Sequence, residues 1–118
     1  SQIAKIANLC GPDFSIYSGN DDQILPILSL GGKGAISVLS NVKPDLACSI
    51  TNSFFKNAIP EACYYQLQAL PLIDSLFAET NPIPIKSALN LIGFDFGIPR
   101  LPLVECSSSL TEKIKKYL

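Results

Sequence analysis

Histidine is absent from this chain of 118 residues, which removes the commonest metal ligand and the commonest general base near neutral pH. No Cys-x-x-Cys pair is present either, which argues against a zinc site and a thioredoxin-like redox site. We therefore expect no metal site. The four cysteines, Cys10, Cys48, Cys63 and Cys106, are flanked by apolar residues and indicate buried thiols in a reducing cytosol, although a disulfide pair stays open.

An excess of positive charge is also missing, since 9 basic residues face 10 acidic residues and the formal net charge is −1. This balance argues against a nucleic-acid partner. The cluster of Lys113, Lys115 and Lys116 is better explained by the dipole at the C-terminal end of a helix than by a phosphate site. No apolar run reaches the length of a membrane span and no signal-peptide pattern opens the chain, so we expect a cytoplasmic protein without a membrane partner.

Charged residues are few for an independent domain. They make up 16% of the chain, against about a quarter in a typical soluble protein, whereas 47% of the residues are hydrophobic. The chain also begins at Ser1, without a methionine and directly inside an amphipathic pattern. We interpret both features as signs of one small domain taken from a larger protein, with one face meant to be covered.

The most informative stretch is residues 30–42, in which three glycines precede a short β-branched run and polar residues follow it. This order is typical of a helix, a tight turn, a buried strand and a further helix, the repeating unit of an α/β barrel. The glycines lack the Gly-x-x-x-x-Gly-Lys-[Ser/Thr] spacing of a phosphate-binding loop, and no dinucleotide fingerprint is present. They therefore indicate turns rather than a nucleotide site.

Apolar spacing, together with helix start and stop signals, predicts a mostly helical chain with two strands at residues 14–18 and 35–39. The helices are expected at residues 1–9, 23–30, from Pro44 onward, 60–79, 85–92 and 110–117. A pair of parallel strands is not stable by itself. The fold class expected is therefore α/β, with the last two strand–helix units of a barrel and additional C-terminal helices.

Three details of these elements are open to direct comparison with a structure. In the helix at 60–79 we expect Leu67, Leu70, Ile73 and Phe77 to face inward. Ser109 and Glu112 have the spacing of a capping box for the last helix. The peptide bond between Asn81 and Pro82, in a rigid double-proline elbow, is a candidate for the cis form.

Four segments carry a resemblance to a known family. They are Ser-Gly-Asn-Asp-Asp at residues 18–22, Leu-Gly-Gly-Lys-Gly-Ala-Ile-Ser-Val at 30–38, Asn-Pro-Ile-Pro-Ile-Lys at 81–86 and Arg-Leu-Pro-Leu at 100–103. In order and spacing they resemble dihydrodipicolinate synthase, a pyruvate-dependent class I aldolase, across essentially the whole chain. The resemblance implies a (β/α)8 TIM barrel, of which residues 1–58 are the last part, from helix 6 to helix 8 with strands 7 and 8, and residues 59–118 a C-terminal helical extension.

The resemblance also implies an activity that requires a part of the enzyme not present in this sequence. The family condenses pyruvate with aspartate semialdehyde in lysine (diaminopimelate) biosynthesis, through a lysine Schiff base and without a cofactor, and is usually a homotetramer. The Schiff-base lysine and the proton-relay residues lie upstream of this chain, so we expect a C-terminal fragment that is inactive alone. Lys33, Lys43 and Lys86 are interpreted as solvated or capping side chains.

Four positions carry over from the family to this sequence. Ile36 matches a residue whose backbone carbonyl faces pyruvate, and Gly19 lies at the mouth of the active site with Asn20 beside it. Helix capping would account for Asn20 and the following aspartates equally well. Leu30 matches a position at a subunit interface, and a core leucine at a helix end is the alternative.

Two further interpretations stay open at this point. Within the same superfamily the parent could resemble N-acetylneuraminate lyase or a keto-deoxy-sugar aldolase, because the residues that select the second substrate lie upstream. From another class, a non-catalytic helical interaction module would explain an exposed apolar surface through partner binding.

Overall fold

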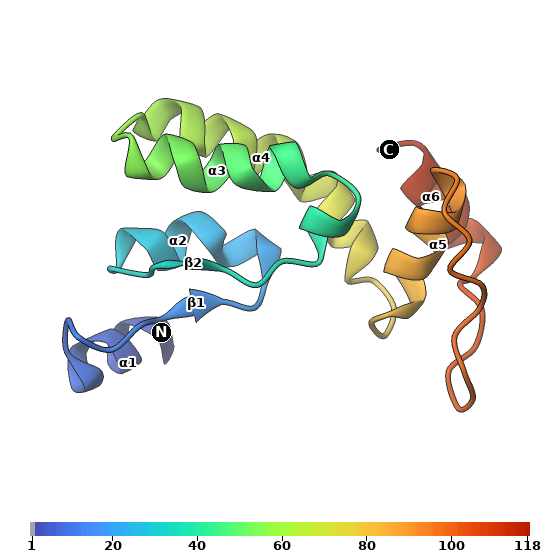
Figure 1. The fold of residues 1–118 in the computed structure, drawn as a ribbon, viewed down its shortest axis with the longest axis horizontal. Coiled ribbons are helices and arrows are strands. Elements are labelled where there is room, and N and C mark those ends of the chain that lie inside the picture. The colour runs from blue at the N-terminus through green and yellow to red at the C-terminus, as the bar shows by residue number, and fades with distance from the viewer. Residues whose placement is uncertain (1) are drawn as a thin grey trace.

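The computed structural model describes residues 2–118, and the predicted helix start at Ser1 lies outside the described residues. Short strands and helices follow one another along the chain (Figure 1). Their bounds are α1 Gln2–Cys10, β1 Tyr17–Ser18, the 3-10 helix η1 Asp21–Gln23, α2 Ile24–Ser29, β2 Gly34–Ala35, the 3-10 helix η2 Leu39–Asn41, α3 Pro44–Phe55, α4 Ile59–Leu76, α5 Ile83–Leu91 and α6 Ser108–Lys115.

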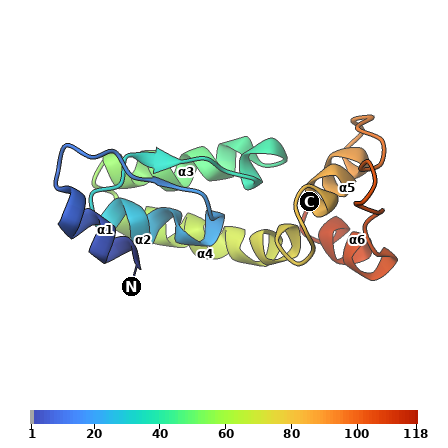
Figure 2. The same cartoon turned by 90° about the horizontal axis from the view of Figure 1, so that it is seen from below.

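The molecule is elongated, with principal extents of 43 × 30 × 21 Å. At one end, α1 and α2 accompany the two strands, and α3 and α4 run antiparallel along each other (Figure 1). At the other end, α5 and α6 lie beside the irregular segment 92–107, and α4 reaches toward them (Figure 2). Helix α4 is therefore the element that joins the strand-bearing end to the C-terminal helices.

The strands β1 and β2 form a parallel pair in which Tyr17 is opposite Gly34 and Ser18 is opposite Ala35. This confirms a parallel pair connected through a helix. The predicted strands were too long, however, because the chain turns away from the ladder soon after Ala35. Val38 has helical backbone angles (φ −77°, ψ −43°), and its N–H binds a side chain instead of a neighbouring strand.

One apolar core runs through the described residues. It combines side chains from both helical ends of the molecule with residues next to the strands. Its buried members are Ile24, Leu28, Leu39, Val42, Ala47, Ile50, Ala69, Leu72, Ile73, Leu76, Ile85, Ala88, Leu89, Leu110 and Ile114. Because α4 contributes four of them, the packing of α4 decides how the two ends are held together.

The predicted inward face of α4 is largely wrong. Ile73 is buried as expected, but Leu67 is 65% exposed, Leu70 is 36% exposed and Phe77, just after the helix, is 40% exposed. The face that packs instead contains the small residues Ala62 and Ala69, together with Gln66, Leu72, Ile73, Ser75 and Leu76. Helix α4 carries apolar residues on two faces, and the face with small side chains is the one packed against the rest of this chain.

Two local expectations near the C-terminus have different outcomes. The peptide bond between Asn81 and Pro82 is cis, as predicted, and a second cis bond between Leu101 and Pro102 was not foreseen. The predicted capping box is wrong, since α6 begins at Ser108 with Ser107 as its N-cap. The hydroxyl of Ser107 donates to Glu79 Oε1 at 2.5 Å, so a residue from before α5 takes the place of a local cap.

The cysteine prediction is also corrected. All four cysteines are free thiols, but Cys10, Cys48 and Cys63 are exposed and only Cys106 is partly buried. Cys63 shares its exposed surface with Tyr64 and Leu67 on the outer face of α4, so an apolar neighbourhood in sequence did not place this thiol in the core of the described residues.

The end of α2 gives a first testable prediction. Gly31 N–H donates to the Leu28 carbonyl at 3.0 Å and Gly32 N–H to the Ile27 carbonyl at 2.9 Å, which forms a Schellman motif and confirms the predicted glycine stop. A Cβ on Gly32 would lie 2.5 Å from Ile27 Cγ2 and 2.7 Å from the Ile27 carbonyl oxygen. Gly32→Ala should therefore lower the free energy of unfolding by about 1–3 kcal/mol, measured by urea unfolding.

The matched control for that variant is Gly19→Ala. A Cβ at Gly19 meets no atom within 4 Å, and its φ lies outside the left-handed region, so its stability should change little. Equal unfolding midpoints for the two variants would contradict the close approach at Gly32.

Candidate functional site

Polar and exposed residues collect where β1 and β2 end. Ile36 N–H donates to the Ser18 carbonyl at 2.7 Å, which places Ile36 beside the end of β1. Gly19 and Asn20 follow Ser18 and are exposed, and the Ile36 side chain is 75% exposed. The structure thus brings the predicted residues Ile36, Gly19 and Asn20 together at the carboxyl end of the strand pair.

The carbonyl of Ile36 is free for a ligand. Among residues 2–118, no donor forms a hydrogen bond with this oxygen. The Ile36 side chain is not packed in a core as it would be on a buried strand, because the described residues leave most of it exposed. The main chain, rather than the side chain, is therefore the part of Ile36 that can act as an acceptor.

The turn after β1 is closed by Ser18 rather than by Asn20. Ser18 Oγ donates to the Asn20 carbonyl at 2.6 Å and accepts from Asn20 N–H at 3.3 Å. Asn20 is the N-cap of η1 but makes no side-chain capping bond. Its amide group stays available at the exposed end of the strands.

Asp21 is a functional candidate whose role the sequence did not reveal. Its side chain is 1% exposed, and its Oδ2 atom accepts from Val38 N–H at 3.0 Å and from Leu39 N–H at 2.8 Å. Oδ1 is buried and has no hydrogen-bond partner among residues 2–118. Asp21 therefore holds the start of η2, which begins three residues after Ile36, and does not cap the helix that follows it in sequence.

Gln66 is a second residue that the sequence analysis missed. It lies on the packed face of α4, is 7% exposed, and its Nε2 donates to the Asp21 main-chain carbonyl at 2.9 Å. Its Oε1 accepts from Leu25 N–H at 3.1 Å. A long amide side chain on a packed face made mainly of small and apolar residues was the available signal, because a buried polar side chain requires partners.

Leu30 lies at the end of α2 and is 44% exposed. A fully packed core leucine is therefore excluded within the described residues, and the interface role stays a prediction. This residue stands at the opposite end of the strand pair from Ile36, since Leu30 precedes β2 and Ile36 follows it.

The three lysines lie where capping or solvated side chains are expected. Lys33 is exposed and precedes β2, at the end of the strands away from Ile36. Lys43 Nζ donates to the Leu118 carbonyl at 2.5 Å, and Lys86 Nζ donates to the Ile98 carbonyl at 3.1 Å. Lys43 and Lys86 are therefore each bonded to a main-chain carbonyl.

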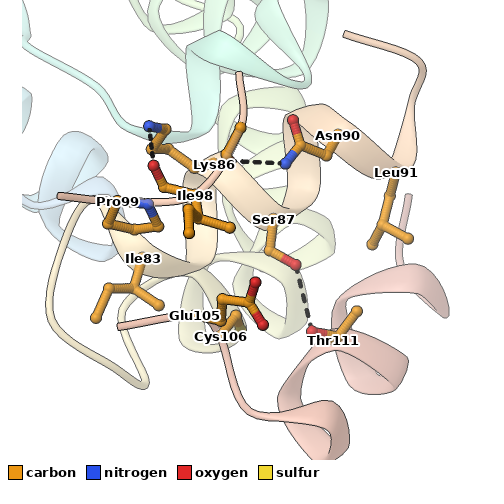
Figure 3. Close-up of a pocket in the computed structure, with 11 residues that line it drawn as sticks. Ile83, Lys86, Ser87, Asn90, Leu91, Ile98, Pro99, Glu105, Cys106 and Thr111 are labelled. Carbon is orange, nitrogen blue, oxygen red and sulfur yellow. Dashed lines mark hydrogen bonds between the residues drawn. The ribbon is translucent and has the colours of Figure 1, made fainter. Parts of the chain in front are cut away.

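A separate cavity of about 340 Å³ lies between α5, α6 and the irregular segment that connects them (Figure 3). Lys86 and Asn90 both donate hydrogen bonds to main-chain carbonyls of that segment, those of Ile98 and Gly97. The hydroxyl groups of Ser87 on α5 and Thr111 on α6 form a hydrogen bond of 3.3 Å in the wall of the cavity (Figure 3). The polar groups of this cavity therefore hold the irregular segment against α5.

Two further properties of residues 2–118 concern metal binding and the membrane. No group of three or more histidine, cysteine, aspartate or glutamate side chains is arranged to hold a metal ion there. In the same part of the chain, no helix is both long and apolar enough to cross a membrane.

Parallel strands joined by a helix, with exposed turns at their carboxyl ends, define a part of an α/β protein of the strand–helix repeat class. The particular family follows from comparison with known proteins. The chain belongs to the dihydrodipicolinate synthetase family, whose sequence model matches residues 1–118. The resemblance inferred from the four sequence segments is thereby confirmed.

The relatives are similar along the whole chain. The 4-hydroxy-tetrahydrodipicolinate synthase of Caldicellulosiruptor saccharolyticus is 51% identical over 118 residues, which are 100% of this chain and 40% of the relative. The 4-hydroxy-tetrahydrodipicolinate synthase 1 of Clostridium acetobutylicum is 57% identical with the same coverage. The crystal structure of dihydrodipicolinate synthase from Thermotoga maritima superposes with a TM-score of 0.92 at 38% identity, covering 98% of this chain and 40% of that one.

These coverages define how much of the family fold is present. The chain spans about 40% of the length of the curated relatives and solved structures it matches. Within that span the fold is mostly helical with a two-stranded sheet, and it is the fold of the corresponding part of the dihydrodipicolinate synthase structures.

Proposed function

We propose that this chain is the C-terminal part of a lyase that condenses pyruvate with aspartate semialdehyde through a lysine Schiff base, in lysine (diaminopimelate) biosynthesis. The observation that carries the proposal is the match of all 118 residues to the family, combined with a main-chain carbonyl at Ile36, where the strands end, that has no hydrogen-bond partner among residues 2–118. The named relatives favour this reaction over that of an N-acetylneuraminate lyase or a keto-deoxy-sugar aldolase, and over a non-catalytic helical module.

In this proposal β1 and β2 are strands 7 and 8 of a (β/α)8 barrel. Their parallel pairing and the exposure of Tyr17 and Ile36 support this assignment, because parallel strands are normally covered on both faces within a larger sheet. Residues 1–58 then complete the barrel and residues 59–118 form the helical extension.

The part of the active site carried by this chain would bind and orient pyruvate. The Ile36 carbonyl is a hydrogen-bond acceptor at the carboxyl end of the barrel strands, the end at which barrel enzymes bind substrate. Gly19 and Asn20 would border the same site. The amine that attacks the keto carbon of pyruvate, and must be unprotonated to do so, would come from the remainder of the enzyme.

The expected assembly and location also belong to the proposal. We place the enzyme in the cytoplasm as a homotetramer, with Leu30 at a subunit interface and no cofactor. Four free thiols suit a reducing compartment, and the 44% exposure of Leu30 suits a surface that a partner covers.

A borohydride trapping experiment tests the proposed reaction. The chain alone, incubated with pyruvate and borohydride, should keep its intact mass, because Lys33 lies at the opposite end of the strands and Lys43 and Lys86 are each bonded to a main-chain carbonyl. A chimera that carries this chain in place of the matching 40% of the Clostridium acetobutylicum synthase should gain one reduced pyruvate adduct.

The location of the adduct decides the outcome of that experiment. Peptide mapping should place it on a lysine from the Clostridium acetobutylicum part of the chimera. An adduct on Lys33, Lys43 or Lys86 would refute the proposal that the Schiff-base lysine lies outside this chain. The unmodified Clostridium acetobutylicum protein serves as the positive control.

A further inference from the structure

We propose that Gln66 of α4, acting through Asp21, is a positioning residue that holds the Ile36 carbonyl in place for pyruvate. This inference rests on the proposed function and extends it, because it assigns a role in the substrate site to a helix that follows both strand–helix units in sequence. The evidence for it is a pair of hydrogen bonds that meet at Asp21. Gln66 of α4 binds the main-chain carbonyl of Asp21, and the Asp21 side chain binds the N–H of Val38, two residues after Ile36.

The first step concerns the peptide unit that contains the Ile36 carbonyl. On one side of it, Ile36 N–H is held by the Ser18 carbonyl at 2.7 Å. On the other side, Val38 N–H is held by Asp21 Oδ2 at 3.0 Å. Since peptide units are planar, holding both neighbouring units sets the positions of the two Cα atoms that flank the Ile36 carbonyl, and its own unit keeps only a rotation about the line that joins them.

The second step concerns what holds Asp21. Both donors, Val38 N–H and Leu39 N–H, approach the same oxygen, Oδ2, and Oδ1 has no partner among residues 2–118. The carboxylate is therefore not anchored through its second oxygen. The position of Oδ2 depends instead on the main chain at Asp21, whose carbonyl accepts from Gln66 Nε2 at 2.9 Å.

The third step concerns Gln66 itself. Its amide uses both ends in buried bonds, donating to Asp21 and accepting from Leu25 N–H at 3.1 Å. It therefore spans η1 and the first turn of α2 from a helix 45 residues away in sequence from Asp21. A buried amide that satisfies two main-chain groups holds them in one relative position, because losing it leaves buried polar groups unpaired.

The test uses the chimera with the Clostridium acetobutylicum synthase and the variant Gln66→Met, which keeps the side-chain length and removes both hydrogen bonds. The KM for pyruvate should rise about tenfold, which corresponds to the loss of one net hydrogen bond, while kcat falls less than about threefold. The matched control is Gln68→Met on the exposed side of the same helix, with an unchanged KM.

Two further variants separate positioning from stability. Gln66→Glu keeps the acceptor for Leu25 and removes the donor to Asp21, so it should raise the KM as Gln66→Met does. Ile114→Ala, in the buried face of α6, should lower the melting temperature and leave the KM unchanged.

The outcomes are distinguishable. Borohydride trapping of pyruvate by the unsubstituted chimera, with the same KM in the Gln66 and Gln68 variants, overturns the positioning role and leaves the proposed function intact. An increase in KM for Ile114→Ala as large as that for the Gln66 variants overturns it as well, because stability alone would then explain the effect. No trapping by the unsubstituted chimera overturns the proposed function and, with it, this inference.

Discussion

Substitution of Asp21 by alanine is expected to lower the free energy of unfolding by about 3 kcal/mol. The side chain is 1% exposed, and its Oδ2 atom satisfies the N–H groups of Val38 and Leu39. Alanine would leave both N–H groups without an acceptor, and a donor that loses its partner away from water costs its full desolvation free energy. The effect should therefore stand at the upper end of those seen for single substitutions.

Urea unfolding followed by circular dichroism measures this effect. The matched control is Asp22→Ala, since Asp22 is the exposed neighbour and should change stability by no more than about 0.5 kcal/mol. Asp21→Asn keeps one oxygen for the two donors and should lie between the other two variants. Equal stability of the alanine variants at 21 and 22 would contradict the role assigned to the carboxylate.

The second large effect is expected in the packed face of α4. Leu76 is completely buried and belongs to the core that the helices share. Leu76→Ala should lower the free energy of unfolding by about 2–5 kcal/mol, because it removes buried methyl groups and leaves a cavity that the surrounding residues fill only in part. Thermal and urea unfolding of the purified chain both report the change.

Leu67→Ala is the control for Leu76→Ala, because it is the same substitution in the same helix at a side chain that is 65% exposed. It should cost much less than the change at Leu76. A larger loss for Leu67→Ala would mean that the outer face of α4 is packed in solution, as the sequence alone had suggested.

The starts and ends of several helices were predictable because they depend on interactions between neighbouring residues only. Gly31 and Gly32 end α2 through bonds to carbonyls three and five residues earlier. Pro44 begins α3, and Gly93 follows α5 in the left-handed region at φ 99°. In each case the backbone property of one residue type is enough to place the boundary.

Strand length and the packed face of α4 were not predictable in the same way. The run after Ala35 has strand-forming residues, but Asp21, 17 residues from Val38, takes up the N–H that a longer strand would have offered to a neighbour. On α4 the apolar pattern fits two faces, and the choice of the face with Ala62 and Ala69 depends on what packs there. Both results depend on tertiary contacts.

The candidate site was predictable only where its residues match the family segments. Ile36, Gly19 and Asn20 were named from that resemblance, and the structure brings them together at one end of the strands. Asp21 was predicted either to border the site or to cap the following helix, and Gln66 was not considered. The partner of Gln66 lies 45 residues away, and no periodicity in the sequence connects them.

The free carbonyl at Ile36 has a consequence for how such a site varies among proteins. A main-chain oxygen is the same group in every residue type, so mutation at position 36 can change the side chain without removing the acceptor. The side chains that position this atom are instead those of Asp21 and Gln66, which form the hydrogen bonds. Position 36, which contacts the substrate, should therefore tolerate substitution, whereas positions 21 and 66, which do not contact it, should not.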